Sequence, residues 1–173
     1  MKNIIFKNET SFLDRFNKQF SQKLLTNEPC RNRAESLEKV FELLNDKKDV
    51  TIVETGTTRS LNWGGDGCAT IIFDDYVNMN GGQVLSIDIS EDTCQFARGQ
   101  VSNKTDVICQ DSIEFLWNYD GPKIDLLYLD SYDYEENNPH PSMLHHIMEL
   151  VAIMPHLEKG SIIVVDDHDP LLD

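Results

Sequence analysis

The residues in this chain that could do chemistry are acids placed at the ends of short apolar runs. Five runs rich in Val, Ile and Leu each end in a carboxylate or are followed by one within two residues. If the runs are parallel strands of one sheet, their carboxyl ends meet along one edge, where open α/β sheets bind ligands. One such acid is ordinarily just solvated charge, but acids in all five places predict a ligand site. In chain order they are Glu54, Asp88, Asp111, Asp130 and the pair Asp166 and Asp167.

The spacing of these runs predicts the fold class. Each gap between consecutive runs exceeds the roughly 12 residues that a crossover between parallel strands requires. Strands that alternate with helical segments are typical of a doubly wound α/β sheet. The expected strands are Val50–Glu54, Gln83–Ile87, Asp106–Cys109, Ile124–Leu129 and Ser161–Val165.

Helical periodicity fills the gaps and the N-terminal part. Apolar residues recur every four positions from Phe12 to Leu24, and a second stripe runs from Leu37 to Leu44, with Pro29 and the segment 27–33 between them. Residues 1–48 are therefore predicted to be a helical lead-in to a domain over 49–173. Three further helical faces are expected at Ala69, Ile72, Phe73 and Val77, at Phe115 and Leu116 after the N-cap Asp111, and at Met143, Leu144, Ile147, Met148 and Val151.

Composition excludes some classes of partner. With 15 Lys and Arg against 30 Asp and Glu, the 173-residue chain has a formal charge of -15, which repels nucleic acids and anionic membranes. Its four cysteines form no C-x-x-C pair, and no early apolar run resembles a signal peptide or membrane span. We therefore expect a reduced, cytoplasmic protein with no nucleic-acid or membrane partner.

The first strand runs into a turn, VTIVETGTTRS, that favours a particular kind of ligand. Gly56 is its only glycine, so the three-glycine turn that brings a pyrophosphate onto a helix is missing. Glu54 beside the turn would repel phosphate. Asp88 after the second strand is placed to bind both hydroxyls of a ribose. A nucleoside that carries positive charge fits this combination better than a dinucleotide.

These segments resemble the motifs of class I S-adenosylmethionine-dependent methyltransferases. Glu54–Gly56 is similar to their first motif, Asp88 to the acid that ends their second strand, and Gln110–Ser112 to the segment that contacts adenine. The resemblance implies a Rossmann-like sheet of order 3-2-1-4-5. The chain departs from the family at Thr57–Asp66, an apparent insertion before a helix that opens at Gly67–Thr70. The implied cofactor contacts are Glu54, Gly56, Thr57, Ser60, Asp88, Gln110, Asp111, Ser112 and Asp130.

Acids after the fourth and fifth strands suggest a hard cation. If these strands are neighbours, Asp130, Asp166 and Asp167 can converge on Mg²⁺. The resemblance here is to metal-dependent O-methyltransferases of the catechol and sugar-modifying type, in which magnesium binds and orients a substrate hydroxyl. It implies a base at Asp133, with His168 as the second candidate.

Aromatic and histidine side chains are further candidates for site residues. Trp63, Tyr132 and Tyr134 are either members of an acceptor pocket or ordinary packing residues. The histidines at 140, 145, 146 and 156 lack the H-E-x-x-H pattern of a zinc site, so a surface or pocket role is expected for them.

The favoured function is S-adenosylmethionine-dependent, magnesium-assisted methylation of a small-molecule hydroxyl. Two alternatives stay open: a nicotinamide-dependent Rossmann oxidoreductase, and a non-catalytic module that binds a nucleoside or a metal. Class I methyltransferases usually add an antiparallel hairpin after the fifth strand, whereas this sequence stops at Asp173. We therefore expect strand five to be an exposed edge, in a truncated chain or in a homo-oligomer that covers it.

Overall fold

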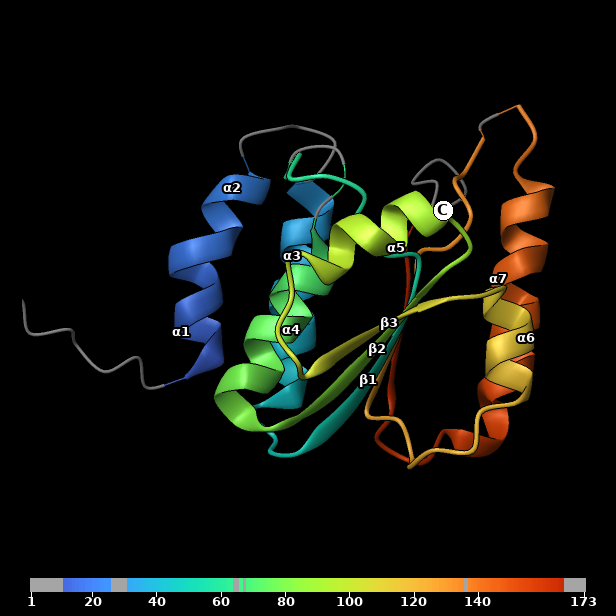
Figure 1. Cartoon of the computed structure of the whole chain (residues 1–173). Helices are drawn as coiled ribbons and strands as arrows, with labels where there is room; N and C mark the ends of the chain where they lie inside the picture. Colours follow the sequence, from blue (N-terminus) through green and yellow to red (C-terminus); the bar gives the residue numbers. More distant parts are fainter. Residues whose placement is uncertain (1–10, 26–30, 64–65, 67, 136, 167–173) are drawn as a thin grey trace, which may run out of the picture.

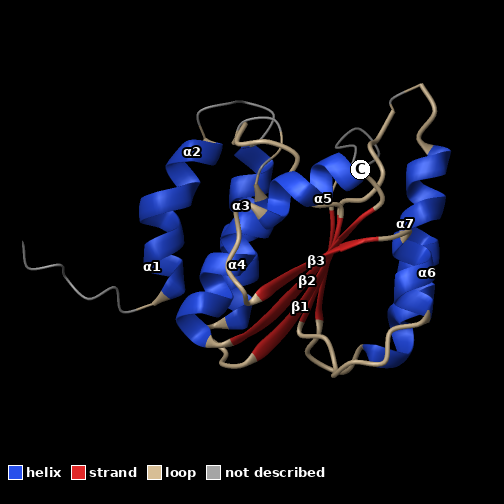
Figure 2. Ribbon diagram, viewed as in Figure 1, coloured by secondary structure: helices blue, strands red, loops and turns tan. Residues whose placement is uncertain are grey.

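A computed structural model of the chain describes all residues except 1–10, 26–30, 64–65, 67, 136 and 167–173. Five parallel strands form one sheet in the order β3-β2-β1-β4-β5 (Figure 2). This confirms the predicted order, and the predicted strand ends are shifted by at most two residues. The strands are β1 (Val50–Thr55), β2 (Gly82–Asp88), β3 (Thr105–Cys109), β4 (Leu126–Leu129) and β5 (Ile162–Val165).

Helices cover both faces of the sheet (Figure 1). All six residues of β1 are buried, as expected for a parallel strand that is covered on both faces of the sheet. On one face lie α1 (Phe12–Phe16), the π-helical turn η1 (Asn17–Ser21), α2 (Gln22–Leu24), α3 (Arg31–Leu44) and α4 (Ala69–Asn80), while α5 (Glu91–Arg98) packs against β2 and β3. On the other face lie α6 (Ser112–Trp117), α7 (His140–Ile153) and the 3-10 turn η3 (Met154–His156).

Aromatic packing joins the N-terminal helices to the sheet. The ring of Phe12 lies 4.7 Å from Phe41 of α3 and 4.9 Å from Tyr76 of α4, and Phe41 stacks on Tyr76 at 5.6 Å. The predicted apolar stripe from Phe12 to Leu24 is confirmed, because its four residues are buried in the same core as side chains of β1. The predicted separator was too long, since α3 begins at Arg31 and Arg33 is already helical.

Helix α7 has an inverted distribution of polar and apolar side chains. It buries Ser142, His146 and Glu149, of which Glu149 is fully inaccessible. The sequence predicted the apolar helical face correctly, but that face points outward. Exposure ranges from 48% to 59% for Met143, Leu144, Ile147, Met148 and Val151.

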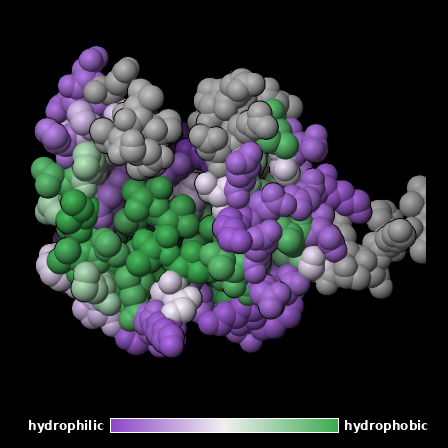
Figure 3. Space-filling view, turned by 180° about the vertical axis from the view of Figure 1, so that it is seen from behind, coloured by the Kyte–Doolittle hydropathy of each residue, from purple (hydrophilic) through white to green (hydrophobic). Residues whose placement is uncertain are grey.

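The apolar surface extends beyond the helix to the sheet edge. Ile163 and Val165 of β5 are 45% and 48% exposed, and the view from behind shows a broad hydrophobic surface on this side (Figure 3). Strand β5 pairs only with β4 in the part of the chain that the structure describes, so the predicted free edge is confirmed there. Among the described helices, none is long and apolar enough to cross a membrane.

We expect a second copy of the chain to cover this α7–β5 surface. The exposed apolar side chains named above form this surface, and a standard interface buries about 800 Å² on each partner. An edge strand can pair with its own copy across a twofold axis, and the uncharged surface brings no like charges together. Light scattering should show a dimer that Ile147→Glu converts to monomer, while Met79→Glu, on the exposed side of α4, leaves it intact. A monomeric wild-type chain at high concentration would contradict this expectation.

Candidate functional site

The candidate site is a cavity at the carboxyl ends of β1, β2 and β4. Strand order reverses between β1 and β4, and such a switch point is where open α/β sheets bind ligands. Six residues predicted from the sequence line the cavity, namely Glu54, Gly56, Thr57, Asp88, Asp130 and Asp133. The rest of the lining is Thr58, Arg59, Asp66, Ala69, Ser90, Thr93 and Ser131.

Gly56 makes the turn that brings two loops together. Its φ of +80° lies in the left-handed region, and its N–H donates to the Ile87 carbonyl at 2.7 Å. A Cβ at this position would lie 2.1 Å from the carbonyl oxygen of Asp130. The turn at Gly56 therefore lies against the loop after β4.

Glu54 is a buried acid at the wall of the cavity. It is 2% exposed, and the Ser86 hydroxyl donates to its Oε2 at 2.5 Å. Burial raises the pKa of Glu54 to about 8, against the opposing effect of hydrogen bonds from Ser86 and Thr70. The side chain therefore holds a proton at neutral pH in the ligand-free protein.

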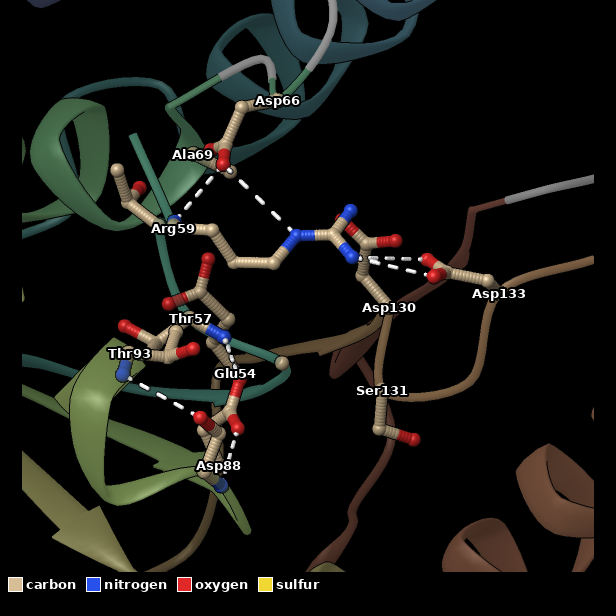
Figure 4. Close-up of a pocket in the computed structure, with 13 residues that line it drawn as sticks. Glu54, Thr57, Arg59, Asp66, Ala69, Asp88, Thr93, Asp130, Ser131 and Asp133 are labelled. Atoms are coloured by element: carbon tan, nitrogen blue, oxygen red, sulfur yellow. Dashed lines mark hydrogen bonds and ion pairs between the residues drawn. The ribbon is translucent and has the colours of Figure 1, made fainter. Parts of the chain in front are cut away.

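Asp88 ties the end of β2 to the turn after β1. Its Oδ2 accepts the Thr57 N–H at 3.2 Å and its Oδ1 accepts the Ser90 N–H at 2.8 Å (Figure 4). A carboxylate can accept about four hydrogen bonds, so these two leave capacity for a ligand. Thr70 fixes the same turn from α4, because its Oγ1 accepts the Thr58 N–H at 2.9 Å. Thr70 stands in the Gly67–Thr70 run but was not among the predicted cofactor contacts.

Asp66, the last residue of the apparent insertion Thr57–Asp66, holds the first part of that segment in place. Asp66 Oδ2 accepts the backbone N–H groups of Arg59 and Ser60 at 2.8 and 3.1 Å. The Arg59 guanidinium then reaches across the cavity to Asp133, at 3.1 and 3.2 Å from its two oxygens (Figure 4). Ser60, predicted to contact the cofactor, lies outside the lining.

The predicted adenine segment after β3 also lies outside the lining. Gln110 is close to it, since its N–H donates to the Asp88 carbonyl at 3.0 Å. Asp111 is the N-cap of α6, as predicted, and accepts the Glu114 N–H at 2.9 Å. Ser112 is buried, with its hydroxyl 3.1 Å from His145 Nε2. Adenine contact stays a prediction for this segment.

The predicted magnesium ligands are only partly brought together. Asp130 lines the cavity, while Asp166 accepts the Tyr128 hydroxyl at 3.0 Å and forms an ion pair with Arg33. Asp167 and the second base candidate, His168, lie outside the described residues. Within the described ranges, no group of three or more His, Cys, Asp or Glu side chains is arranged to hold a metal ion. The Arg33 contact was missed because that residue lies in the predicted linker.

Two of the aromatic and histidine candidates, Trp63 and His145, contact other elements of the fold. Trp63 stacks on Phe20 at 5.8 Å, with Lys23 Nζ 4.2 Å above the Trp63 ring, so it belongs to the N-terminal helical layer. His145 lies next to Tyr132, with a ring separation of 5.5 Å, and its Nε2 is 3.3 Å from Glu149 Oε1. Ser131, which lines the cavity, also donates to that Glu149 oxygen at 2.7 Å. The loop after β4 is thus anchored on α7.

Comparison with known proteins gives a similarity of fold. No protein-family model and no curated protein matches the chain. Its structure is similar to the crystal structure of a SAM-dependent methyltransferase from Thiobacillus denitrificans in complex with S-adenosyl-L-homocysteine, with a TM-score of 0.51 and 14% identity. The match covers 76% of this chain and 47% of that one, so the chain spans less than half the length of this neighbour. The likeness shows a Rossmann-like α/β fold.

Glu54 should make stability depend on pH. The unfolded chain releases this proton from about pH 4.5 upward and the folded chain holds it until about pH 8, so stability falls as pH rises between these values. The unfolding midpoint of Glu54→Gln should therefore fall less than that of wild type between about pH 5.5 and 7.5. Glu42→Gln, at an exposed position of α3, is the control. Parallel curves for wild type and Glu54→Gln would contradict the assignment.

Replacing Gly56 with alanine should destabilise the protein far more than the same change at a glycine that also has a positive φ but no atoms near the added Cβ. Gly160 has a φ of +105°, and a Cβ added there would meet nothing within 4 Å, so Gly160→Ala should cost only backbone strain, ~1 kcal/mol. Gly56→Ala adds the clash with Asp130 and should lower the free energy of unfolding by at least ~3 kcal/mol. Urea unfolding measures both, and equal losses would show that the approach to Asp130 is unimportant.

Proposed function

We propose that the chain binds S-adenosylmethionine in the cavity at β1, β2 and β4 and catalyses methyl transfer from it. The observation that carries the proposal is the charge of the lining. Five carboxyl groups and one guanidinium line the cavity, at the position where Rossmann-like sheets bind nucleosides. A sulfonium nucleoside gains from this field, whereas the pyrophosphate of a nicotinamide dinucleotide would be repelled by it. The fold neighbour, solved with S-adenosyl-L-homocysteine, supports the same assignment.

Two acids have distinct proposed roles in binding. Asp88 accepts hydrogen bonds from the ribose hydroxyls, using the lone pairs that are not bonded to the Thr57 and Ser90 N–H groups. Glu54 faces the cationic end of the cofactor. Because a buried acid with a raised pKa ionises when a positive charge comes close, binding draws the proton from Glu54.

The finer part of the proposal concerns the acceptor. When bound, S-adenosylmethionine supplies an electrophilic methyl group on sulfur. We propose a small-molecule hydroxyl as the nucleophile and Asp133 as the group that takes its proton. Asp133 is exposed at the rim of the cavity, where Arg59 holds its carboxylate. His168 is the alternative base.

Magnesium assistance does not fit the described residues. A guanidinium cation already lies between two of the three predicted ligands, since Arg33 pairs with Asp166 and is 3.9 Å from Asp130 Oδ2. The proposal therefore routes no step through a metal.

Calorimetry tests cofactor binding and its class. S-adenosylmethionine and S-adenosylhomocysteine should bind and NADH should not. Asp88→Asn should weaken binding by roughly 10- to 100-fold, since hydrogen bonds to a charged group are worth ~1.5–3 kcal/mol. Asp106→Asn, at an exposed acid of β3, should leave the affinity unchanged. NADH binding, or no binding of either adenosyl compound by folded protein, would overturn the proposal.

The role of Glu54 predicts proton release. At pH 7, S-adenosylmethionine binding should release close to one proton in buffers of different ionisation enthalpy, and S-adenosylhomocysteine, which lacks the sulfonium charge, should release fewer. Glu54→Gln should abolish the difference. Equal proton release on binding of the two ligands would contradict the placement of Glu54 near the cationic end of the cofactor. Labelled methyl transfer to a panel of hydroxyl compounds then separates an enzyme from a non-catalytic binding module.

A further inference from the structure

Arg33 of α3 joins three loops that meet at the carboxyl edge of the sheet. Its side chain is 13% exposed. Its NH1 donates to the Asp66 carbonyl at 2.8 Å, and its NH2 pairs with Asp166 and lies 3.9 Å from Asp130 Oδ2. The loops after β1, β4 and β5 are thus held by one guanidinium from the N-terminal helical layer.

The two acids that face Arg33 already have its guanidinium as a counter-ion. Asp166 Oδ2 accepts the Tyr128 hydroxyl as well as the Arg33 contact. The side chains of Asp166 and Asp130 are only 19% and 24% exposed, so their charges need compensation within the protein. Burial acts to lower the pKa of Arg33, but Tyr128, Asp166 and Asp130 outweigh it and the pKa is raised. The side chain stays charged.

We propose that Arg33 is a resident cation that takes the place of a divalent ion between Asp130 and Asp166. It is a positioning residue. It neutralises the two acids, sets the distance between the ends of β4 and β5, and holds the Asp66 carbonyl so that the carboxylate of Asp66 can fold the loop carrying Arg59. A planar fork with several donors suits this task, because one guanidinium binds a carbonyl and carboxylates at once, which an ammonium cannot do with the same geometry.

Mn²⁺ binding measured by electron paramagnetic resonance tests the proposal without any cofactor or acceptor. Wild-type protein should have no Mn²⁺ site at Asp130, so the Asp130→Asn substitution should not change its Mn²⁺ binding. Arg33→Met keeps much of the side-chain volume and removes the charge, so the freed acids should bind Mn²⁺ at least roughly tenfold more tightly than in wild type. Adding Asp130→Asn to Arg33→Met should abolish the gain. Arg15→Met, which breaks the α1–α4 ion pair with Asp75, is the matched control and should create no Mn²⁺ site.

A second variant keeps the test decisive if Arg33→Met fails to fold. Arg33→Lys keeps the charge and should exclude Mn²⁺ as wild type does, yet it should lower the unfolding midpoint because the bond to the Asp66 carbonyl is lost. Wild-type Mn²⁺ binding that disappears in Asp130→Asn would overturn the proposal, and so would an unchanged Mn²⁺ affinity in a folded Arg33→Met variant. Neither result depends on whether the chain transfers methyl groups.

Discussion

The pairing of β1 with β2 on one side and β4 on the other determines where the site forms. Thr55 pairs in register with Ile87 of β2 and Leu129 of β4, so the loops after these three strands begin next to one another. Two further hydrogen bonds extend this pairing beyond the strand ends. The Gly56 N–H donates to the Ile87 carbonyl at 2.7 Å, and the Asp130 N–H donates to the Thr55 carbonyl at 2.9 Å. A slip of one residue would turn Glu54 to the opposite face of the sheet, away from α4. The cavity is thus a consequence of strand register.

Much of this arrangement could be predicted because it depends on local sequence. Buried parallel strands are continuous apolar runs, and an acid after each run must lie at the carboxyl edge whatever the details of packing. Strand order and six of the thirteen residues that line the cavity follow from these facts and from the family resemblance. The capping role of Asp111 is equally local, because an N-cap needs only the following turn of helix.

The contacts that could not be predicted join residues far apart in the chain. Arg33 lies in a segment that looks like a linker, and nothing near it in the sequence indicates a carboxylate more than a hundred positions later. Ser86 and Thr70 are ordinary strand and helix residues until the fold places them against Glu54. The outward apolar face of α7 is the plainest case. Periodicity shows that such a helix has an apolar face, but only the tertiary structure shows which way that face points.

The ties between the lead-in and the sheet bear on whether the chain is modular. A boundary near residue 48 separates two compositional patterns, yet Phe12 and Phe41 pack on Tyr76 across it and Arg33 supplies charge to the far edge. The N-terminal helices are therefore not a detachable lid over a finished domain. Without them, aromatic surface would be uncovered and two half-buried acids would lose their counter-ion together. The two parts should unfold in one cooperative transition. A different N-terminal segment could replace the helices only if it both covered the apolar surface and supplied a positive charge.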